Sequence, residues 1–358
     1  MIQPITLHEL VQRHGSWLES GVDEGPVISS RVRLARNLED YHFPGWASEE
    51  QKHAIWKQTY ELFSEMDDAF MCWKMESLPD TDRELLFERH LISQELANKE
   101  AENGVFVSPD EMMAIMINEE DHIRIQTLKP GLQLKQAWEA ASRIDDQLEQ
   151  QLLYAYHARL GFLTSCPSNV GTGLRASVML HLPGLVLLEE MDPVVNGISK
   201  IGLAVRGMWG EGSEAVGNMF QVSNQITLGK GEEQIVNHLE QIVLELVEHE
   251  QNARQRLLHE NPIMVKDHIA RSFGLLAHAK LMASGEALNL LSTLRLGLDL
   301  GMVSGFSRQE MDQLYISTQP AHLQKIQQSE LAPNDRDFVR AEMLRNFMKR
   351  ATLKVEQE

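Results

Sequence analysis

The sequence predicts an α+β fold in which a region of β-hairpins is followed by helices. In MMAIMINEEDHIRIQTL, apolar and β-prone residues stand on both sides of a polar NEED bend, which is typical of a β-hairpin. In KIGLAVRGMWGEGSEAVGNMFQVSNQITLG, apolar and polar residues alternate around a glycine-rich middle, as in two strands joined by a loop. From Glu232 onward, apolar residues recur at helical spacing. These patterns indicate paired strands before residue 232 and a helical region after it.

The elements before the NEED bend follow from local signals. The first twenty-odd residues are expected to form one short amphipathic helix, and the run VISSRVRLARN predicts a strand. Ser48, followed three residues later by Gln51, forms a capping box that opens a helix over 47–68. A further helix is expected over 83–100.

After the bend, leucines at helical spacing predict a long helix over 132–159. The run FLTSCPSNVGTGLRASVMLHLPGL predicts a short strand, a loop, and a helix that begins near Gly173. An acidic helix is expected over 232–259, and Asn261–Pro262 is the best candidate for a domain boundary. The expected core leucines beyond it are Leu275, Leu276, Leu281, Leu288, Leu291 and Leu294.

Composition limits the class of protein. With 358 residues, 43% of them hydrophobic and 24% charged, the chain is expected to fold and to hold two domains. Its net charge of −19 disfavours nonspecific binding to nucleic acid or to an anionic membrane. Two cysteines exclude a disulfide framework and suit a reducing cytosol. No signal peptide or membrane span is recognisable, so a soluble, cytoplasmic protein is expected.

Arginines beside loop residues are the first candidates for chemistry. A guanidinium is a rigid donor fork that matches phosphate oxygens, so several together can hold a triphosphate. Each one taken alone can equally make a surface ion pair in an acidic protein. No P-loop, dinucleotide fingerprint or ordinary protein-kinase motif is present in the sequence. The arginines concerned are Arg31, Arg33, Arg124, Arg175 and Arg206.

Carboxylates and one cysteine complete the candidate set. Glu119, Glu120 and Asp121 stand together in the NEED bend, where a solvated acidic turn is the plain alternative. Glu211 lies in a glycine-rich stretch that can close over a substrate as a lid. Cys166 precedes the expected helix near Gly173, whose dipole could depress the pKa of a thiol, although a single cysteine is more often a small buried hydrophobe.

Four ordered motifs carry a resemblance to a known family. SSRVRLARN, NEEDHIR, TSCPSNVGTGLRASV and RGMWGEGSEA resemble the motifs of the phosphagen (guanidino) kinase catalytic domain, over about residues 20–255. Within that superfamily the whole chain is most similar to the bacterial protein arginine kinases. Ser29 comes almost immediately after the start, so the helical N-terminal domain of the small-molecule enzymes is expected to be absent. Residues 256–358 are additional, and NDRDFVRAEML in them matches the phosphoarginine-binding RDxxRA motif.

The resemblance implies a fold and a set of site residues. The fold is an antiparallel β-sheet flanked by helices over 21–255, after a short helical segment over 1–20, followed by an all-α domain over 256–358. Glu120 and Glu211 would grip the acceptor guanidinium, with Cys166 as a nearby thiolate. ATP is implied as the phosphoryl donor, with Mg²⁺ held through its phosphates and water rather than by a protein metal site. The implied ATP-site residues are Ser29, Ser30, Arg31, Val32, Arg33, His90, Arg124, Arg175, Ala176, Ser177, Val178, Met179, Arg206, Gly207, Met208, Trp209, Gly210 and Glu211. The implied allosteric phosphoarginine site comprises Arg336, Asp337, Phe338, Val339, Arg340 and Ala341.

The implied function is ATP-dependent phosphorylation of arginines in proteins, marking them for regulation or degradation in stress response and protein quality control. The resemblance also implies an activator, McsA, the ClpC protease as a partner, and a homodimer or higher oligomer, with no nucleic-acid or membrane partner. Two alternatives stay open: a small-guanidine phosphagen kinase, and a phosphoarginine-binding adaptor without catalysis. For Arg336, Asp337 and Arg340, the alternative to an allosteric site is an exposed ion-pair face.

Overall fold

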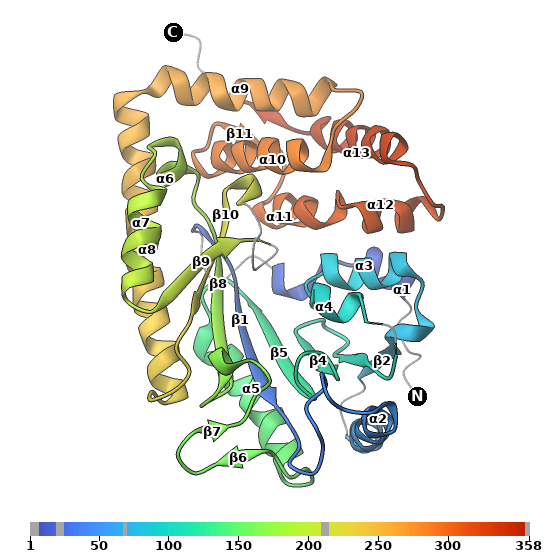
Figure 1. Cartoon of the computed structure of the whole chain (residues 1–358). Coiled ribbons are helices and arrows are strands. Elements are labelled where there is room, and N and C mark those ends of the chain that lie inside the picture. The colour runs from blue at the N-terminus through green and yellow to red at the C-terminus, as the bar shows by residue number, and fades with distance from the viewer. Residues whose placement is uncertain (1–6, 19–24, 67–69, 100, 209–214, 355–358) are drawn as a thin grey trace. The chain divides into compact units, whose positions relative to one another are not determined.

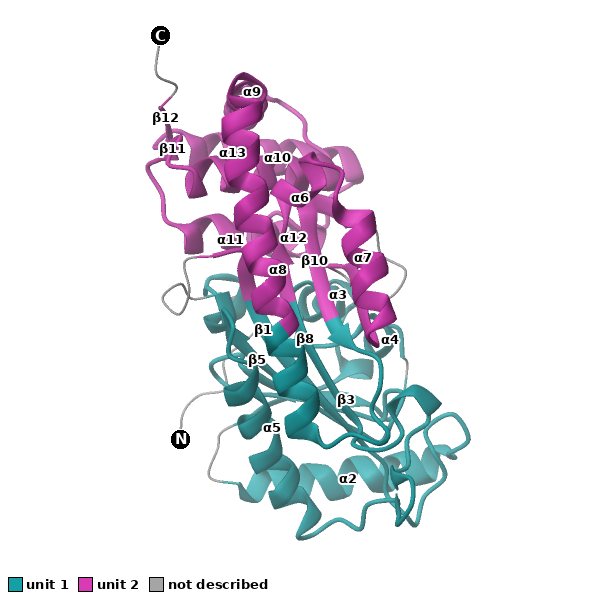
Figure 2. Ribbon diagram, turned by 90° about the vertical axis from the view of Figure 1, so that its left-hand side faces the viewer, with its two compact units in different colours: residues 1–19, 29–178, 223–241 teal, residues 20–28, 179–222, 242–358 magenta. Residues whose placement is uncertain are grey.

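The computed structural model describes residues 7–18, 25–66, 70–99, 101–208 and 215–354. Packing divides the chain into two compact units, coloured teal and magenta in Figure 2. Neither unit is continuous in the sequence, so the domain bounds 1–20, 21–255 and 256–358 stay predictions. The first unit comprises Met1–Glu19, Ser29–Val178 and Ser223–Gln241, and the second comprises Ser20–Ile28, Met179–Val222 and Ile242–Glu358.

Among the described residues, eight strands form one sheet in the order β2-β3-β4-β5-β1-β8-β10-β9 (Figure 1). The hairpin predicted around the NEED bend is confirmed, since β4 (Met113–Ile117) pairs antiparallel with β5 (Ile123–Pro130). The predicted strand VISSRVRLARN is β1 (Val27–Arg36), which is antiparallel to β5. The other strands are β2 (Met71–Lys74), β3 (Gly104–Val107), β8 (Leu174–His181), β9 (Leu203–Gly207) and β10 (Met219–Asn224), with separate pairs β6 (Tyr156–His157) with β7 (Gly161–Phe162) and β11 (Val303–Ser304) with β12 (Thr352–Leu353).

The two faces of β1 have different roles. Arg36 is buried and turns to one face, where its Nε lies 3.0 Å from Oδ2 of Asp145 on α5 (Leu134–Glu149). Val32 and Leu34, which share the parity of Arg36, are fully buried on that face. Because successive side chains of a strand point to opposite faces, Arg31 and Arg33 lie on the other face. The alternation of side chains along β1 thus places Arg36, which pairs with Asp145, on one face, and Arg31 and Arg33 on the face that could bind a ligand.

The helix predicted over 47–68 is confirmed as α2 (Glu49–Glu65). Its capping box is present, because Ser48 Oγ accepts from the Gln51 backbone N–H at 3.4 Å and the Gln51 side chain accepts from the Ser48 N–H at 3.4 Å. The single helix predicted for the first twenty residues is wrong within residues 7–18. A short helix and a 3₁₀ turn lie there instead, with Gly15, a poor helix former, between them. They are α1 (Leu7–Val11) and η1 (Ser16–Leu18).

One predicted helix, over 83–100, is broken in two. α3 (Asp80–Glu88) ends before His90, whose φ of 57° is left-handed and cannot continue a helix. A new helix, α4 (Gln94–Ala97), then begins after Ser93, whose Oγ accepts from the Leu96 N–H at 3.1 Å. The prediction failed because helical periodicity does not register a single left-handed residue.

The chain around residue 150 is also less helical than predicted. α5 ends at Glu149 rather than near 159, because Tyr154 bridges to Leu38 and the following residues form β6 and β7. The helix predicted near Gly173 is wrong, since residues 174–181 are the strand β8. Asn224 holds that strand through its side chain, which accepts from the Ala176 N–H at 2.8 Å. Between β7 and β8, the described helical structure is the short turn η3 (Pro167–Asn169).

The second unit contains most of the helices. The helix predicted over 232–259 is confirmed as α8 (Glu232–Glu260), and α9 (Pro262–His278) begins directly after Asn261. Leu275 and Leu281 are exposed rather than core residues, because Leu275 lies off the buried face of α9 and Leu281 follows its end. No described helix has the length and apolar character that crossing a membrane requires. The other predicted core leucines are buried: Leu276, Leu288, Leu291 and Leu294. The remaining helices are η2 (Met75–Ser77) in the first unit and, in the second, α6 (Pro183–Leu187), α7 (Met191–Lys200), η4 (Val216–Asn218), α10 (Ser284–Asp299), α11 (Arg308–Ser317), α12 (Pro320–Gln327) and α13 (Pro333–Met348).

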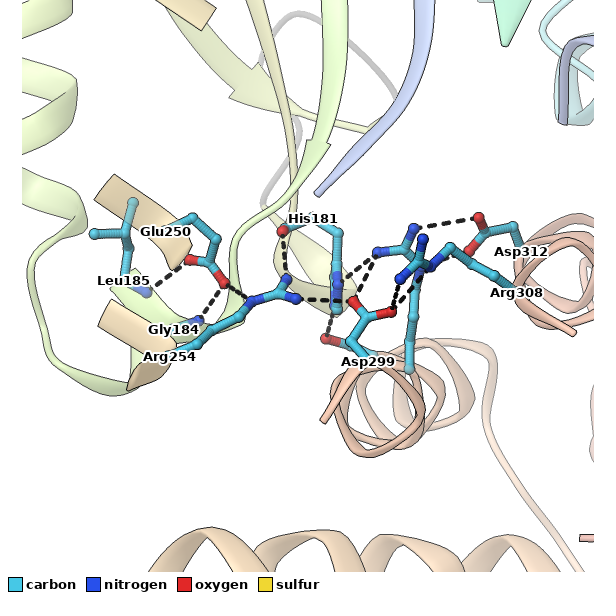
Figure 3. Close-up of polar contacts among 10 residues, drawn as sticks. His181, Gly184, Leu185, Glu250, Arg254, Asp299, Arg308 and Asp312 are labelled. Carbon is cyan, nitrogen blue, oxygen red and sulfur yellow. Dashed lines mark hydrogen bonds and ion pairs between the residues drawn. The ribbon is translucent and has the colours of Figure 1, made fainter. Parts of the chain in front are cut away.

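A buried ionic network ties these helices together (Figure 3). The fully buried guanidinium of Arg295 on α10 donates to Oδ1 of Asp312 on α11 at 2.6 Å. Its Nη1 lies 3.0 Å from Nδ1 of His181, at the end of β8. Burial opposes the charge on Arg295, but Asp312 and Asp299 outweigh it and raise its pKa. The guanidinium is therefore a permanently charged centre that holds two helices and a strand end.

The network continues along α10 to α8 and α6. Asp299 accepts from Arg308 Nε at 2.9 Å and from Arg254 Nη1 at 2.8 Å. Arg254 in turn donates from Nε to Glu250 at 2.5 Å. Glu250 also accepts hydrogen bonds from the backbone N–H groups of Gly184 and Leu185, which have no partner within the first turn of α6. The charges are thus mutually compensated, as burial requires.

Candidate active site

The predicted arginines gather on the face of the sheet opposite α5. Arg31 and Arg33 lie on it from β1. Arg124 of β5 is in register with Ala35, which shares their parity, so it points to the same face. Arg31 Nε donates to Ser177 Oγ of β8 at 3.5 Å, and Arg175 alternates to the same side as Ser177. Four of the five predicted arginines are therefore brought together within the first unit.

This cluster carries positive charge that its surroundings compensate only in part. Burial, followed by repulsion from Arg175 and Arg124, lowers the pKa of Arg31 to about 10. Burial and then Arg31 likewise hold the pKa of Arg33 well below its usual value. Within the described residues, Nε of Arg33 is buried and has no hydrogen-bond partner. A multiply charged anion would reduce the repulsion among these arginines and would accept a hydrogen bond from Arg33 Nε. The surface ion-pair alternative does not account for Arg31 and Arg33.

His90, another predicted ATP-site residue, lies over the same face. Gln126 on β5, opposite Arg33, donates from Nε2 to the His90 carbonyl at 2.7 Å. The imidazole packs edge-on against Trp17 of η1, with ring centroids 5.4 Å apart. Burial, followed by the charge of Arg31, lowers the pKa of His90 to about 3, so the ring is neutral near pH 7. Trp17 had no sequence signal that connected it with the site.

The NEED bend is built on Asn118, whose φ of 57° is tolerated by asparagine. Glu119 and Asp121 are fully buried, whereas the side chain of Glu120 is 32% exposed. Glu119 accepts from Arg124 Nη1 at 2.8 Å, and Glu120 Oε2 lies 2.6 Å from Arg124 Nη2. The solvated acidic turn considered from the sequence is therefore wrong. Of the three carboxylates, Glu120 alone is both anchored and partly open to solvent.

Burial raises the pKa of Glu120 above the usual 4.5, and the opposing effect of Arg124 is smaller. A raised pKa makes the ionised carboxylate a stronger proton acceptor. If Glu120 must be ionised for the reaction, kcat/KM falls as the pH drops through this raised pKa. We therefore expect the acid limb of the pH profile of kcat/KM, followed by ADP release, to lie above pH 4.5. An acid limb at or below that value would show that another group controls the rate.

Cys166 lies beside the bend on the loop before β8. Asp121 Oδ1 accepts from the Ser165 N–H at 2.7 Å, which ties that loop to the bend. Sγ of Cys166 lies 3.0 Å from Oγ of Ser168, and the thiol is half-exposed rather than buried. The helix expected to act on this thiol is absent, because residues 167–169 form a single 3₁₀ turn. The Ser168 hydroxyl, rather than the N-terminus of a longer helix, is therefore the polar neighbour of this thiol.

The remaining predicted site residues have different positions. The side chains of Ser30, Val32, Ala176 and Val178 are buried on the face opposite the arginines, whereas Ser29 and Met179 share the arginine side by parity. Arg206 and Gly207 end β9, in the second unit, and Met208 follows. Trp209, Gly210 and Glu211 lie outside the described residues.

The RDxxRA motif begins within the first turns of α13. Arg340 is buried and donates to the Thr318 and Met282 carbonyls at 2.8 Å each and to Asp337 Oδ1 at 2.6 Å. The alternative interpretation of Arg340 as part of an exposed ion-pair face is therefore wrong. Arg336 and Val339 are half-buried, Phe338 is 48% exposed and Ala341 is buried. The motif thus combines an anchored guanidinium with a partly open surface.

Comparison with known proteins agrees with this arrangement. A family model described as "ATP:guanido phosphotransferase, C-terminal catalytic domain" matches residues 52–253, and one described as "Protein-arginine kinase McsB C-terminal domain" matches residues 262–358. The chain belongs to the ATP:guanido phosphotransferase family. Among similar curated proteins are the protein-arginine kinase of Halothermothrix orenii, 44% identical over 95% of this chain and 99% of that protein, and that of Geobacillus kaustophilus, 47% identical over 93% of each. The resemblance inferred from the four motifs is thereby confirmed.

Solved structures support the fold. Lombricine kinase matches with a TM-score of 0.57 and 24% identity over 67% of this chain and 68% of that chain. The substrate-free duplicated taurocyamine kinase of Schistosoma mansoni also has a TM-score of 0.57, with 21% identity over 79% of this chain and 44% of that chain. The predicted α+β fold, a phosphagen-kinase sheet flanked by helices with a helical C-terminal region, is confirmed.

Proposed function

We propose that this chain is an ATP-dependent protein arginine kinase, which transfers the γ-phosphoryl group of ATP to arginine guanidinium groups of proteins. One observation carries the proposal: partly uncompensated guanidiniums of Arg31 and Arg33 share a sheet with the partly open carboxylate of Glu120. The first group suits a polyphosphate, and the second suits a guanidinium. The similarity of nearly the whole chain to protein-arginine kinases supports a protein as the acceptor.

The donor side fits ATP through its phosphates. Arg31, Arg33 and Arg175 would hold phosphate oxygens, and the buried Nε of Arg33 would gain the acceptor that it lacks among the described residues. Mg²⁺ would be held through the nucleotide phosphates and water, as this ion prefers oxygen ligands and retains its waters. With the nucleotide bound, this ion would neutralise charge on the transferring group. The neutral ring of His90 adjoins the cluster and would contact the nucleotide without adding charge.

The acceptor side must grip and deprotonate an arginine. Its guanidinium has a pKa above about 12, so a carboxylate has to orient the planar group and accept a proton as the N–P bond forms. Glu120 is proposed for this role, and its 2.6 Å contact with Arg124 supports the proposal because the carboxylate already pairs with a guanidinium. Glu211 is proposed as the second carboxylate. Cys166 is proposed to act as a thiolate close to the same guanidinium, without forming a covalent intermediate.

Nucleotide affinity should depend on the guanidinium forks. Replacing Arg175 or Arg206 by lysine is expected to weaken ATP binding at least tenfold, because a lysine is a point charge and cannot make two parallel hydrogen bonds. Arg124→Lys should also weaken it, together with an effect on the NEED bend. Calorimetric titration measures these dissociation constants, and Arg143→Lys, on the exposed side of α5, is the control. Unchanged values in all three variants would place these arginines outside the ATP site.

The C-terminal motif is proposed as an allosteric phosphoarginine site. A phosphoryl group needs a guanidinium fork and a phosphoarginine guanidinium needs a carboxylate, which Arg336 and Asp337 would supply. Free phosphoarginine is expected to stimulate phosphorylation of a protein substrate several-fold in wild type and in Glu342→Ala, an exposed position of α13. Asp337→Ala should lose the stimulation. Equal stimulation in Asp337→Ala, or none in wild type, would remove the motif from regulation.

The cellular setting is part of the proposal. Phosphorylated proteins would be marked for regulation or degradation in cytoplasmic stress response and protein quality control. An activator resembling McsA, the ClpC protease and a homodimer or higher oligomer are the proposed partners. These follow from the family resemblance, which the match of residues 262–358 to a protein-arginine kinase domain supports.

Detection of phosphoarginine on protein tests the proposal. After reaction with ATP and an arginine-rich protein, mass spectrometry at neutral pH should find acid-labile phosphate on arginine side chains. Fast turnover of free arginine or creatine instead would favour the small-guanidine phosphagen kinase. Bound ATP without any transfer would favour the phosphoarginine-binding adaptor.

A further inference from the structure

Three separate segments of the first unit meet at one buried amide and one buried carboxylate. Asn37, directly after β1, donates from Nδ2 to Oδ1 of Asp121 at 2.6 Å and to the Leu163 carbonyl at 3.1 Å. Its Oδ1 accepts from the His122 N–H at 2.9 Å. The same Oδ1 of Asp121 accepts from the Ser165 N–H at 2.7 Å. The end of β1, the NEED bend and the Cys166 loop are thereby fastened to one another.

The two side chains at the centre of these contacts are buried, whereas Leu163 and Ser165 on the loop are half-buried. Asn37 is 1% exposed and Asp121 is fully buried. Hydrogen bonds away from water are stronger than those at the surface, and breaking one leaves a buried polar group without a partner. The bend and the loop are therefore held in one arrangement.

The arrangement determines where the reacting side chains lie. Glu120 stands between two anchored neighbours: Glu119 is fixed by Arg124 on one side and Asp121 by Asn37 and Ser165 on the other. Cys166 follows Ser165 directly. The Oδ1 atom of Asp121, the residue after Glu120, thus binds the backbone of Ser165, the residue before Cys166.

We propose that Asp121 and Asn37 are positioning residues, which hold the Glu120 carboxylate and the Cys166 thiol at a fixed separation around the acceptor guanidinium. The inference rests on the proposed function. In this account Asp121 acts through Oδ1 as a hydrogen-bond acceptor, and its negative charge takes no part in the reaction. Its Oδ2 is buried and has no hydrogen-bond partner in the described ranges, which raises the alternative that Oδ2 binds the substrate directly.

Asparagine at position 121 separates these roles, because its amide oxygen can accept both hydrogen bonds although the charge is lost. With saturating ATP and a varied protein substrate, Asp121→Ala is expected to lower kcat/KM about 10²-fold, the scale of a misplacement near 1 Å. Asp121→Asn should stay within several-fold of wild type, and ATP affinity should be unchanged in both. Asp110→Ala is the matched control, since Asp110 also ties a bend, through the Met112 N–H at 3.1 Å, but on the exposed surface.

The second readout does not depend on phosphoryl transfer. Loss of the Ser165 anchor should free the loop, so iodoacetamide should alkylate Cys166 several-fold faster in Asp121→Ala and Asn37→Ala than in wild type or Asp121→Asn. Peptide mass spectrometry separates Cys166 from Cys72, whose pKa burial raises to about 12 so that its thiolate is scarce. Asn37→Ala provides the same test if Asp121→Ala does not fold.

Two results would overturn the inference. Impairment of Asp121→Asn equal to that of Asp121→Ala would assign the charge of Asp121 a direct role. Alkylation rates and kcat/KM equal to wild type in both alanine variants would show that no positioning occurs. If wild type itself modifies no protein arginine, the proposed function fails, whereas the alkylation rates still report whether the bend holds the loop.

Discussion

Glu120→Gln is expected to lower phosphorylation of protein arginine by roughly 10²–10⁴-fold, the scale of losing a positioned general base. Glutamine keeps an oxygen that can accept from Arg124, which lies 2.6 Å away, so the bend should keep its shape. It cannot accept the proton that the acceptor guanidinium must release. ATP binding, measured by calorimetry, should therefore stay close to wild type. Glu211→Gln is expected to have a similar effect.

The matched control for Glu120 is Glu61→Gln. Glu61 also pairs with a cation, Lys57, but on the exposed surface of α2, so its loss should leave the rate unchanged. A rate near wild type in both Glu120→Gln and Glu211→Gln would remove these carboxylates from the mechanism. A parallel loss of ATP binding would instead indicate a damaged fold.

The largest expected effect on stability comes from Arg295→Met. Methionine replaces the aliphatic stem of arginine but carries no charge, so it would leave Asp312 buried without the guanidinium that lies 2.6 Å from it. Removing one partner of a buried ion pair costs about 3–5 kcal/mol. Denaturant unfolding followed by circular dichroism should report this loss, and the transition should involve the second unit, which contains the network.

Arg271→Met provides the surface counterpart. Arg271 pairs with Asp267 one turn away on α9, and its side chain is 75% exposed. Exposed pairs contribute about 0–1 kcal/mol, so this variant should unfold almost as wild type does. Equal unfolding free energies for Arg295→Met and Arg271→Met would mean that the buried network does not stabilise the unit.

The sequence predicts best what depends on local periodicity and on short motifs. The capping box of Ser48 and Gln51, the hairpin around the NEED bend and the helix that begins at Glu232 are all present. Each depends on residues close together in the chain. The alternation of β1 also places Arg31 and Arg33 on one face, which period 2 implies without knowledge of the fold.

The predictions fail where residues distant in the sequence determine the local structure or the burial of a side chain. The helix expected near Gly173 is a strand because Asn224 and the neighbouring strands pair with it. The left-handed backbone of His90 interrupts the helix that apolar periodicity predicted over 83–100. Burial of Glu119 and Asp121, which leaves Glu120 as the accessible carboxylate, depends on partners as distant as Ser93 and Asn37. No local pattern around the acidic bend contains that information.

The most direct test of the account is a competition for phosphate between free arginine and an arginine-bearing protein in one reaction. Wild type receives a limiting amount of ATP, Glu120→Gln serves as the blank, and phosphoarginine is quantified at neutral pH in the protein and small-molecule fractions. Phosphate is expected predominantly on the protein, with at least a hundredfold less in the blank. Phosphate predominantly on free arginine would contradict it.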